Sequence, residues 1–332
     1  MFFILTKKRK VVEWCFLLFI SILTLVITVN SKSLDLPFTI LILLSSYDKD
    51  IEFLMKNILW GMITGIFTVL LLFSMGIIPD VVQVRLGVMR RSLGFSLPII
   101  LPALFFSLTT CYIFCKKEKL KKSECLIFVI IGYVISTLCD GRAPFILTIL
   151  IVFGTIIIHY IDISKLKFIK YLGIFSLLSA ISISMYFYYN YNYNNALHLT
   201  INQLLTGRIE WWNLYRNEYF IKLFGQEIMR VGGAANNLDI NHRMMILDNA
   251  FISILLEYGI IMCILSILFL LKPMTTKIEY YEKKDYVILF IFITWIIYGI
   301  VSNQLYFIDR NFSLLMMSSL IYRRKLKEKR NV

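Results

Sequence analysis

Histidine is scarce in this chain, and so are the residue patterns that build metal centres. The 332 residues include three histidines, His159, His198 and His242, and six cysteines. Cys111 and Cys115 lie one helical turn apart, but no second pair has the spacing of zinc ligands. The cysteines lie in or beside apolar runs and are predicted to be small membrane residues rather than disulfides. The sequence therefore predicts no metal site and no other cofactor.

Motifs for nucleotide binding and for common hydrolases are missing as well. The chain has no P-loop, no GxGxxG after a strand, no HExxH and no GxSxG. Acidic residues are outnumbered by basic ones, 21 against 35, so the net charge is +14. Such a charge suggests nucleic acid in a soluble protein, but here most lysines fill short joints between apolar runs. This distribution is typical of orientation by the positive-inside rule, so the expected partner is membrane lipid and not nucleic acid.

Long apolar runs dominate the chain, of which 58% is hydrophobic, with a mean hydropathy of +0.74. Only membrane proteins tolerate such runs in this number. We expect an all-α polytopic integral membrane protein, with residues 1–332 forming a single membrane domain. The ten predicted spans are residues 11–29, 34–46, 57–78, 95–115, 125–138, 145–161, 169–186, 249–271, 286–301 and 312–322.

The second run, Leu34–Ser46, is shorter than the roughly 20 residues that a straight span needs. If it crosses, all the lysine-rich joints and both termini lie on one face, the cytoplasm. If it does not, the N-terminal cluster and the Lys116–Lys122 joint lie on opposite faces. The positive-inside rule favours the first arrangement, with tilt or local thinning of the bilayer accommodating the short segments.

One large polar loop, residues 188–248, interrupts the apolar runs and is predicted to lie outside the cell and to contain helical segments. In this topology the outward-facing loops carry arginine rather than lysine. Arginine binds phosphate and carboxylate with two parallel hydrogen bonds, so this set favours a phosphate-bearing or acidic substrate. The alternative is that individual arginines pair with Asp80, Asp140, Glu210, Glu218 or Asp309. The outward set comprises Arg85, Arg90, Arg91, Arg142, Arg208, Arg216, Arg230, Arg243 and Arg310.

Aromatic residues accompany the arginines of the loop. If the stretch Arg208–Phe220 is helical, then Arg208, Trp212 and Arg216 share one face. An indole beside a guanidinium suits a sugar phosphate, because the ring can stack on the sugar while the guanidinium holds the phosphate. The alternative is an aromatic belt at the membrane surface, which is favoured for Trp211 and the loop tyrosines.

Four motifs, taken together and in order, resemble those of the bacterial O-antigen and capsular polysaccharide repeat-unit polymerases, which share a fold with the O-antigen ligases. Two departures accompany the likeness: Asp248 stands where many relatives carry histidine, and Pro98-Ile99 stands where the family has Pro-Asn. The motifs are Arg91-Ser-Leu-Gly-Phe-Ser-Leu-Pro98, Asp140-Gly-Arg142-Ala-Pro144, Thr206-Gly-Arg208 with Trp212 and Leu223-Phe-Gly225, and Asp248-Asn-Ala-Phe251 with Glu257-Tyr-Gly259.

The resemblance implies a metal-independent glycosyltransferase in the bacterial cytoplasmic membrane. Its substrate would be an oligosaccharide repeat unit on undecaprenyl pyrophosphate, joined to others at the outer face of that membrane. Flippase and chain-length regulator proteins are the implied protein partners. The alternatives are a polysaccharide ligase of the same fold, or a flippase or other transporter of the lipid-linked oligosaccharide, which would place charges deep inside the spans.

The resemblance also suggests roles for single residues. We expect Arg142 and Arg208 to clamp the donor pyrophosphate and Asp248 to act as general base on the acceptor hydroxyl. Two alternatives remain for that position: Asp248 caps the following helix, or His242 is the base. The residues expected to bind substrate are Arg90, Arg91, Trp212, Arg216, His242, Arg243 and Arg310.

Overall fold

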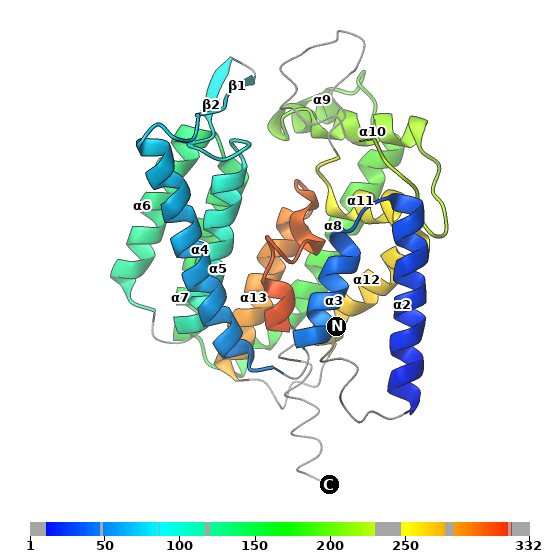
Figure 1. Ribbon diagram of the computed structural model, residues 1–332, viewed down its shortest axis with the longest axis horizontal. Coiled ribbons are helices and arrows are strands. Elements are labelled where there is room, and N and C mark those ends of the chain that lie inside the picture. Colours follow the sequence, from blue (N-terminus) through cyan, green and yellow to red (C-terminus); the bar gives the residue numbers. More distant parts are fainter. Residues whose placement is uncertain are drawn as a thin grey trace. The chain divides into compact units, whose positions relative to one another are not determined.

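The computed structural model describes residues 11–46, 49–85, 87–116, 120–229, 247–275, 282–317 and 320, with only the backbone at positions 12, 13 and 85. Most of these residues are helical, as the sequence predicts (Figure 1). The chain forms two compact units. The loop unit comprises Met1–Asp48, Ile174–Thr275 and Gly299–Asp309, and the hairpin unit comprises Lys49–Gly173, Thr276–Tyr298 and Arg310–Val332.

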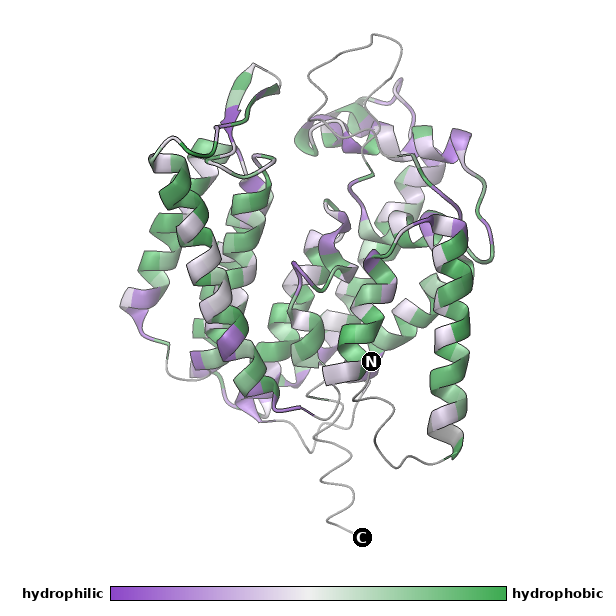
Figure 2. Cartoon of the chain, in the orientation of Figure 1, coloured by the Kyte–Doolittle hydropathy of each residue, from purple (hydrophilic) through white to green (hydrophobic). Residues whose placement is uncertain are grey.

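Within the described ranges, five helices are long and apolar enough to cross a membrane. Their residues are predominantly hydrophobic along the whole length, whereas the joints between them are polar (Figure 2). Large apolar side chains such as Phe53, Trp60 and Phe67 face outward, which only a lipid environment tolerates at this density. The fold is therefore that of a helical membrane protein. The five are α2 (Val11–Ser31, with the span at Trp14–Ser31), α4 (Ile51–Ser74), α6 (Lys122–Cys139), α7 (Arg142–Tyr160) and α8 (Phe168–Asn190, preceded by η1, Lys165–Lys167).

Four further predicted spans are shorter helices, of 12 to 17 residues: α3 (Asp35–Ser46), α5 (Ile100–Lys116), α12 (Gly259–Met274) and α13 (Lys283–Tyr298). The predicted run 249–271 is divided into two helices, α11 (Ala250–Glu257) and α12, with one residue, Tyr258, between them. In the last predicted run, residues 313–317 are helical, and residues beyond 320 lie outside the described part. The count of ten spans remains a prediction.

The predicted start of α4 was six residues too late. Asp50 caps the helix, since its Oδ1 accepts hydrogen bonds from the backbone N–H groups of Glu52 and Phe53 at 2.9 and 3.3 Å. The predicted start of the next helix was five residues too early, because residues 95–99 form turns and α5 begins at Ile100. In the hairpin unit, α5 and α13 are buried almost throughout, and the Phe106 and Trp295 rings lie 4.9 Å apart between them.

Residues 80–93, predicted as a loop, include the two-stranded sheet that names the hairpin unit. Strand β1 (Val82–Arg85) pairs antiparallel with β2 (Val88–Arg91), and Val82 lies opposite Arg91. The fold is thus predominantly α-helical, as expected, with this short sheet as an element that the sequence did not predict. In the loop unit, the large loop contains helices, as predicted: α9 (Ala196–Leu204) and α10 (Arg208–Glu218). The short helix η3 (Asn303–Tyr306) packs against α11 in the same unit.

Candidate functional site

The large loop has its own hydrophobic core, built on one face of α10. Ile209, Trp212 and Tyr215 recur every three residues and are fully buried against Tyr188 at the end of α8 and Ile252 of α11. This face holds the loop as a folded part of the unit. The expectation that the Trp212 indole stacks on substrate was wrong, because its ring is enclosed in this core and presents no exposed face.

The start of α10 is a sharp reversal that places Arg208 at the first helical position. Thr206 and Gly207 both adopt left-handed backbone angles, with φ of 57° and 81°. The side chain of Asn202 accepts hydrogen bonds from the N–H groups of Ile209 and Glu210, at 3.0 and 3.2 Å. These amides of the first turn are thus already bonded, so anion binding at this helix end depends on the Arg208 side chain.

Arg208, at the start of α10, and Asp248, at the end of the loop, form an ion pair. The distance from Arg208 Nε to Asp248 Oδ2 is 3.4 Å, and the side chains are 17% and 32% exposed. The residues are 40 positions apart in sequence. The structure therefore brings together two of the three residues predicted to be catalytic, at a half-buried position where a charged pair is only partly screened by water.

Asn249, not Asp248, caps the helix that follows. Its Oδ1 accepts from the N–H groups of Phe251 and Ile252, both at 3.0 Å, and its Nδ2 donates to Ser184 and to the Ile300 carbonyl. The alternative that Asp248 serves as the helix cap is therefore wrong. The fully buried Asn249 amide fixes the backbone next to Asp248 and leaves its carboxylate to pair with Arg208.

Two of the motifs seen in the sequence meet where α11 gives way to α12. The N–H of Gln226 donates to the Glu257 carbonyl at 3.1 Å, and the N–H of Ile260 donates to the Lys222 carbonyl at 3.1 Å. Gly225 and Gly259 have φ of 78° and 86°, and a side chain on either would collide with the backbone of the other segment. Leu223-Phe-Gly225 and Glu257-Tyr-Gly259 are therefore two halves of one backbone contact, which closes the loop onto the membrane helices.

Arg216, expected to bind substrate, contacts the end of α8. Its Nη1 donates to the Tyr189 carbonyl at 2.5 Å, and its guanidinium lies 5.3 Å from the centre of the Tyr189 ring. The side chain is exposed at the surface of α10. This arginine ties α10 to α8, and whether it also contacts substrate remains a prediction.

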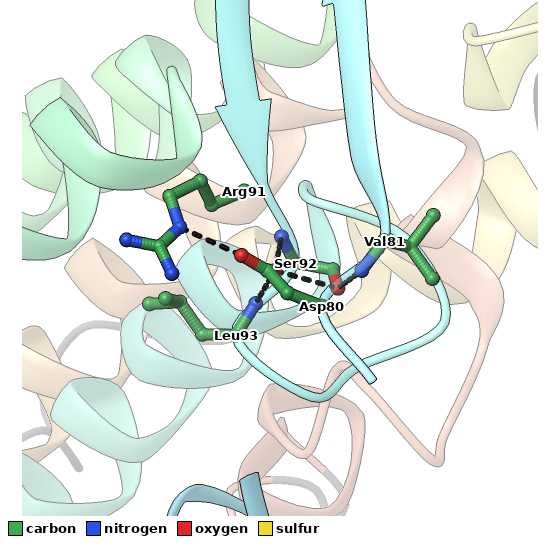
Figure 3. A network of polar contacts seen from close by, with 5 residues as sticks. All are labelled: Asp80, Val81, Arg91, Ser92 and Leu93. Atoms are coloured by element: carbon green, nitrogen blue, oxygen red, sulfur yellow. Dashed lines mark hydrogen bonds and ion pairs between the residues drawn. The ribbon is translucent and has the colours of Figure 1, made fainter. Parts of the chain in front are cut away.

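In the hairpin unit, Asp80 organises the base of the β-hairpin (Figure 3). One carboxylate oxygen accepts from Arg91 Nε at 2.6 Å, and the other accepts from the N–H groups of Ser92 and Leu93 at 3.0 and 2.9 Å. The Ser92 hydroxyl in turn accepts from the Val81 N–H at 2.8 Å. Burial raises the pKa of Asp80, but the hydrogen bonds from Arg91 and from the backbone outweigh it and leave the pKa below its ordinary value.

A second arginine cluster lies between α6 and α7. Asp140 ends α6 in a left-handed conformation, with φ of 51°, and accepts from Arg142 Nε at 2.8 Å. The buried Arg90 lies 3.8 Å from the same carboxylate and donates to the Cys139 carbonyl at 3.3 Å. Arg142 is 70% exposed, so Asp140 orients a guanidinium group that remains open to solvent.

The predicted pairing of arginines with Asp80 and Asp140 is thus confirmed for Arg90, Arg91 and Arg142. The sequence did not identify Asn202 or Asn249 as the residues that support Arg208 and Asp248, although asparagine just before an apolar helical run is a known capping signal. In Arg310, the backbone carbonyl accepts from Ser107 at 2.5 Å, within the hairpin unit.

The predicted site residues fall in both units, and two lie outside the described residues. Arg90, Arg91, Arg142 and Arg310 belong to the hairpin unit, whereas Arg208, Trp212, Arg216 and Asp248 belong to the loop unit. His242 and Arg243 are not among the described residues. Within the described ranges, no three His, Cys, Asp or Glu side chains are grouped so that they could hold a metal ion.

Comparisons of the chain with models of known families, with curated proteins and with solved structures found no match. Membership of the polymerase family therefore stays a hypothesis, which rests on the four motifs and on the contacts that they make.

Proposed function

We propose that this protein is a polysaccharide repeat-unit polymerase, a glycosyltransferase that joins undecaprenyl-pyrophosphate-linked oligosaccharides at the outer face of the bacterial cytoplasmic membrane. The proposal rests on the helical membrane fold, on the four motifs and on the ion pair between Arg208 and Asp248. That pair is the observation that carries it, because it joins a phosphate-binding group to a proton acceptor at one half-buried point.

The reaction needs both groups. The bond between the anomeric carbon and the pyrophosphate oxygen breaks, and the acceptor hydroxyl oxygen bonds to that carbon. Negative charge develops on the leaving lipid pyrophosphate, and a preorganised guanidinium stabilises it without a metal. The proton of the acceptor hydroxyl goes to the carboxylate of Asp248, which lies beside the Arg208 guanidinium. Arg208 approaches Asp248 most closely through Nε, so its two terminal nitrogens are the ones assigned to phosphate.

The motifs also predict a phosphate contact for Arg142, which lies in the hairpin unit. Asp140 holds this side chain through Nε while leaving it 70% exposed, an arrangement suited to presenting a guanidinium to an anion. Arg90 pairs with Asp140 at the end of α6, and Arg91 pairs with Asp80 at the base of the β-hairpin. Arg90 thus shares Asp140 with Arg142, and substrate contacts of Arg90 and Arg91 remain a prediction.

Transport of the lipid-linked oligosaccharide is the main alternative from another class. A transporter is expected to place charged residues deep inside its spans, along a central path. In the five apolar segments long enough to cross a membrane, the charged residues stand near one end: Glu52 and Lys56 in α4, Lys122 and Glu124 in α6, Arg142 in α7, and Lys165, Lys167 and Lys170 in η1 and the first turn of α8. This distribution supports transfer over transport. A ligase of the same fold would use the same site.

The test is elongation in a non-vectorial assay. Purified protein in detergent or nanodiscs, given a lipid-linked repeat unit and a chelator, should produce a ladder of longer lipid-linked oligosaccharides. A protein that moves the substrate across vesicles but never lengthens it would be a transporter. A protein that transfers the glycan to a second acceptor without lengthening it would be a ligase.

A further inference from the structure

Residues 219–229, which follow α10, expose large apolar side chains on the face turned away from the loop core. Tyr219, Ile221 and Ile228 pack against that core. Other side chains of the segment point outward: Phe220, Leu223 and Met229 are 84%, 58% and 66% exposed, and Phe224 is exposed as well. Because the segment has apolar side chains on both faces, its outer face is expected to be covered by a protein partner or by lipid.

Three contacts place this segment at the ends of membrane helices. Lys32, the residue after the α2 span, pairs with Glu227 at 2.6 Å. The N–H groups of Ile260 and Ile261, in the first turn of α12, donate to the carbonyls of Lys222 and Leu223 at 3.1 and 3.3 Å. The exposed Lys32–Glu227 pair contributes little stability, but it locates the segment beside the end of a helix whose outward residues face lipid.

We propose that residues 220–229 form a lipid-binding edge that seats the large loop on the bilayer surface. Its partner is the membrane itself, at the boundary between headgroups and acyl chains. Phe220, Leu223, Phe224 and Met229 enter the boundary, and Lys222 lies beside them where it meets anionic headgroups. Side chains of this mixture are those that bind membrane interfaces, with the apolar part buried about 5–10 Å deep.

Leu25 and Val29, near the end of α2 that Lys32 follows, are also exposed, and the Lys32–Glu227 pair brings this end of α2 to the edge. A protein partner covering the edge would therefore lie against residues of α2 that face lipid. The inference concerns the attachment of the loop and does not depend on which chemistry the protein performs.

Spin labelling measures the depth of each side chain directly. Phe220 and Phe224 are replaced by cysteine, one at a time, in full-length protein whose six native cysteines have been replaced, and each variant is labelled with a nitroxide. The matched control is Asn217→Cys, an exposed polar position at the end of α10. The proteins are reconstituted in vesicles of phosphatidylethanolamine and phosphatidylglycerol. Collision rates are measured with oxygen, which concentrates in lipid, and with a water-soluble nickel chelate.

The labels at 220 and 224 should collide with oxygen more often, and with nickel several-fold less often, than the label at 217. Nickel collision rates equal to those at 217 would place the segment in water and overturn the proposal. Low collision rates with both reagents would mean that protein covers the segment, which also overturns it. Retained helical circular dichroism of each labelled variant verifies that the fold is intact.

Discussion

Replacing Gly225 by alanine should open the contact that closes the large loop. The left-handed backbone at this position costs an alanine about 1 kcal/mol. The added Cβ would also collide with the Glu257 carbonyl, so the two segments must separate. Separation removes three hydrogen bonds, donated by Gln226, Ile260 and Ile261, each contributing about 1 kcal/mol. The expected cost is therefore about 4 kcal/mol of local stability.

Gly76→Ala is the matched control, because Gly76 has a similar φ of 73° but nothing within 4 Å of the added carbon. This substitution should cost only the backbone part, about 1 kcal/mol. Because Gly76 lies in the hairpin unit, its substitution should leave the contact at Gly225 unchanged. The loss of about 3 kcal/mol with the three hydrogen bonds in the Gly225→Ala protein corresponds to a roughly hundredfold larger population of the open contact.

The population of the open contact can be measured by hydrogen–deuterium exchange with mass spectrometry, because the three backbone N–H groups that donate these bonds exchange only when the contact is open. Exchange of Gln226, Ile260 and Ile261 in the Gly225→Ala protein should accelerate by roughly a hundredfold relative to the Gly76→Ala protein. Equal exchange in the two variants, at full expression and folding, would refute the reasoning, because it would mean that the close approach of the two segments carries no energy.

Further predictions concern charge and topology. Arg142→Lys and Arg208→Lys should lose elongation nearly as fully as the alanine variants, by roughly a hundredfold, because lysine cannot bind phosphate with two parallel hydrogen bonds; near-normal polymer from Arg142→Ala would refute its role. Because the pKa of Asp80 is lowered in the folded protein, its stabilisation is present above its unfolded pKa of about 4 and is lost as pH falls below it. The melting temperatures of wild type and Asp80→Asn should thus differ at pH 7 and converge as the pH falls through the lowered pKa of Asp80 in the folded protein. The single-cysteine variants Asn194→Cys and Lys119→Cys are made in protein whose native cysteines have been replaced. In intact cells, an impermeant thiol reagent should label Asn194→Cys but not Lys119→Cys, and the reverse pattern would overturn the proposed topology.

Most helices could be predicted from the sequence because long apolar runs favour few other structures. The ends of the helices were less predictable. Charged residues in the first turns of a helix resemble those of a polar loop between helices, unless the capping residue before them is identified. Asp50 is such a cap, and it extends α4 backward through Glu52 and Lys56. The hairpin strands are only four residues long, too short for their alternation to stand out.

The candidate site was predictable in its residue types and less so in its contacts. Arginine-rich motifs identified Arg208 and Arg142, but the pairing of Arg208 with Asp248 joins residues 40 positions apart and depends on the folded loop. Trp212 was misassigned because an aromatic residue beside arginine looks the same in sequence whether it faces a ligand or a core. Asn249 was overlooked as the helix cap for a similar reason, since the aspartate before it is an equally good capping residue.

Elongation by the Asp248→Asn protein tests the central proposal most directly. Asparagine keeps the size and the hydrogen-bond acceptor of aspartate but cannot take a proton, and Asn249 still caps α11. At equal expression and folding, we predict that the variant fails to lengthen a lipid-linked repeat unit in vitro, whereas His242→Ala lengthens it nearly as well as wild type. Normal elongation by Asp248→Asn, with loss of activity in His242→Ala, would contradict the assignment of the base. The absence of any elongation by the folded wild-type protein would contradict the proposed function itself.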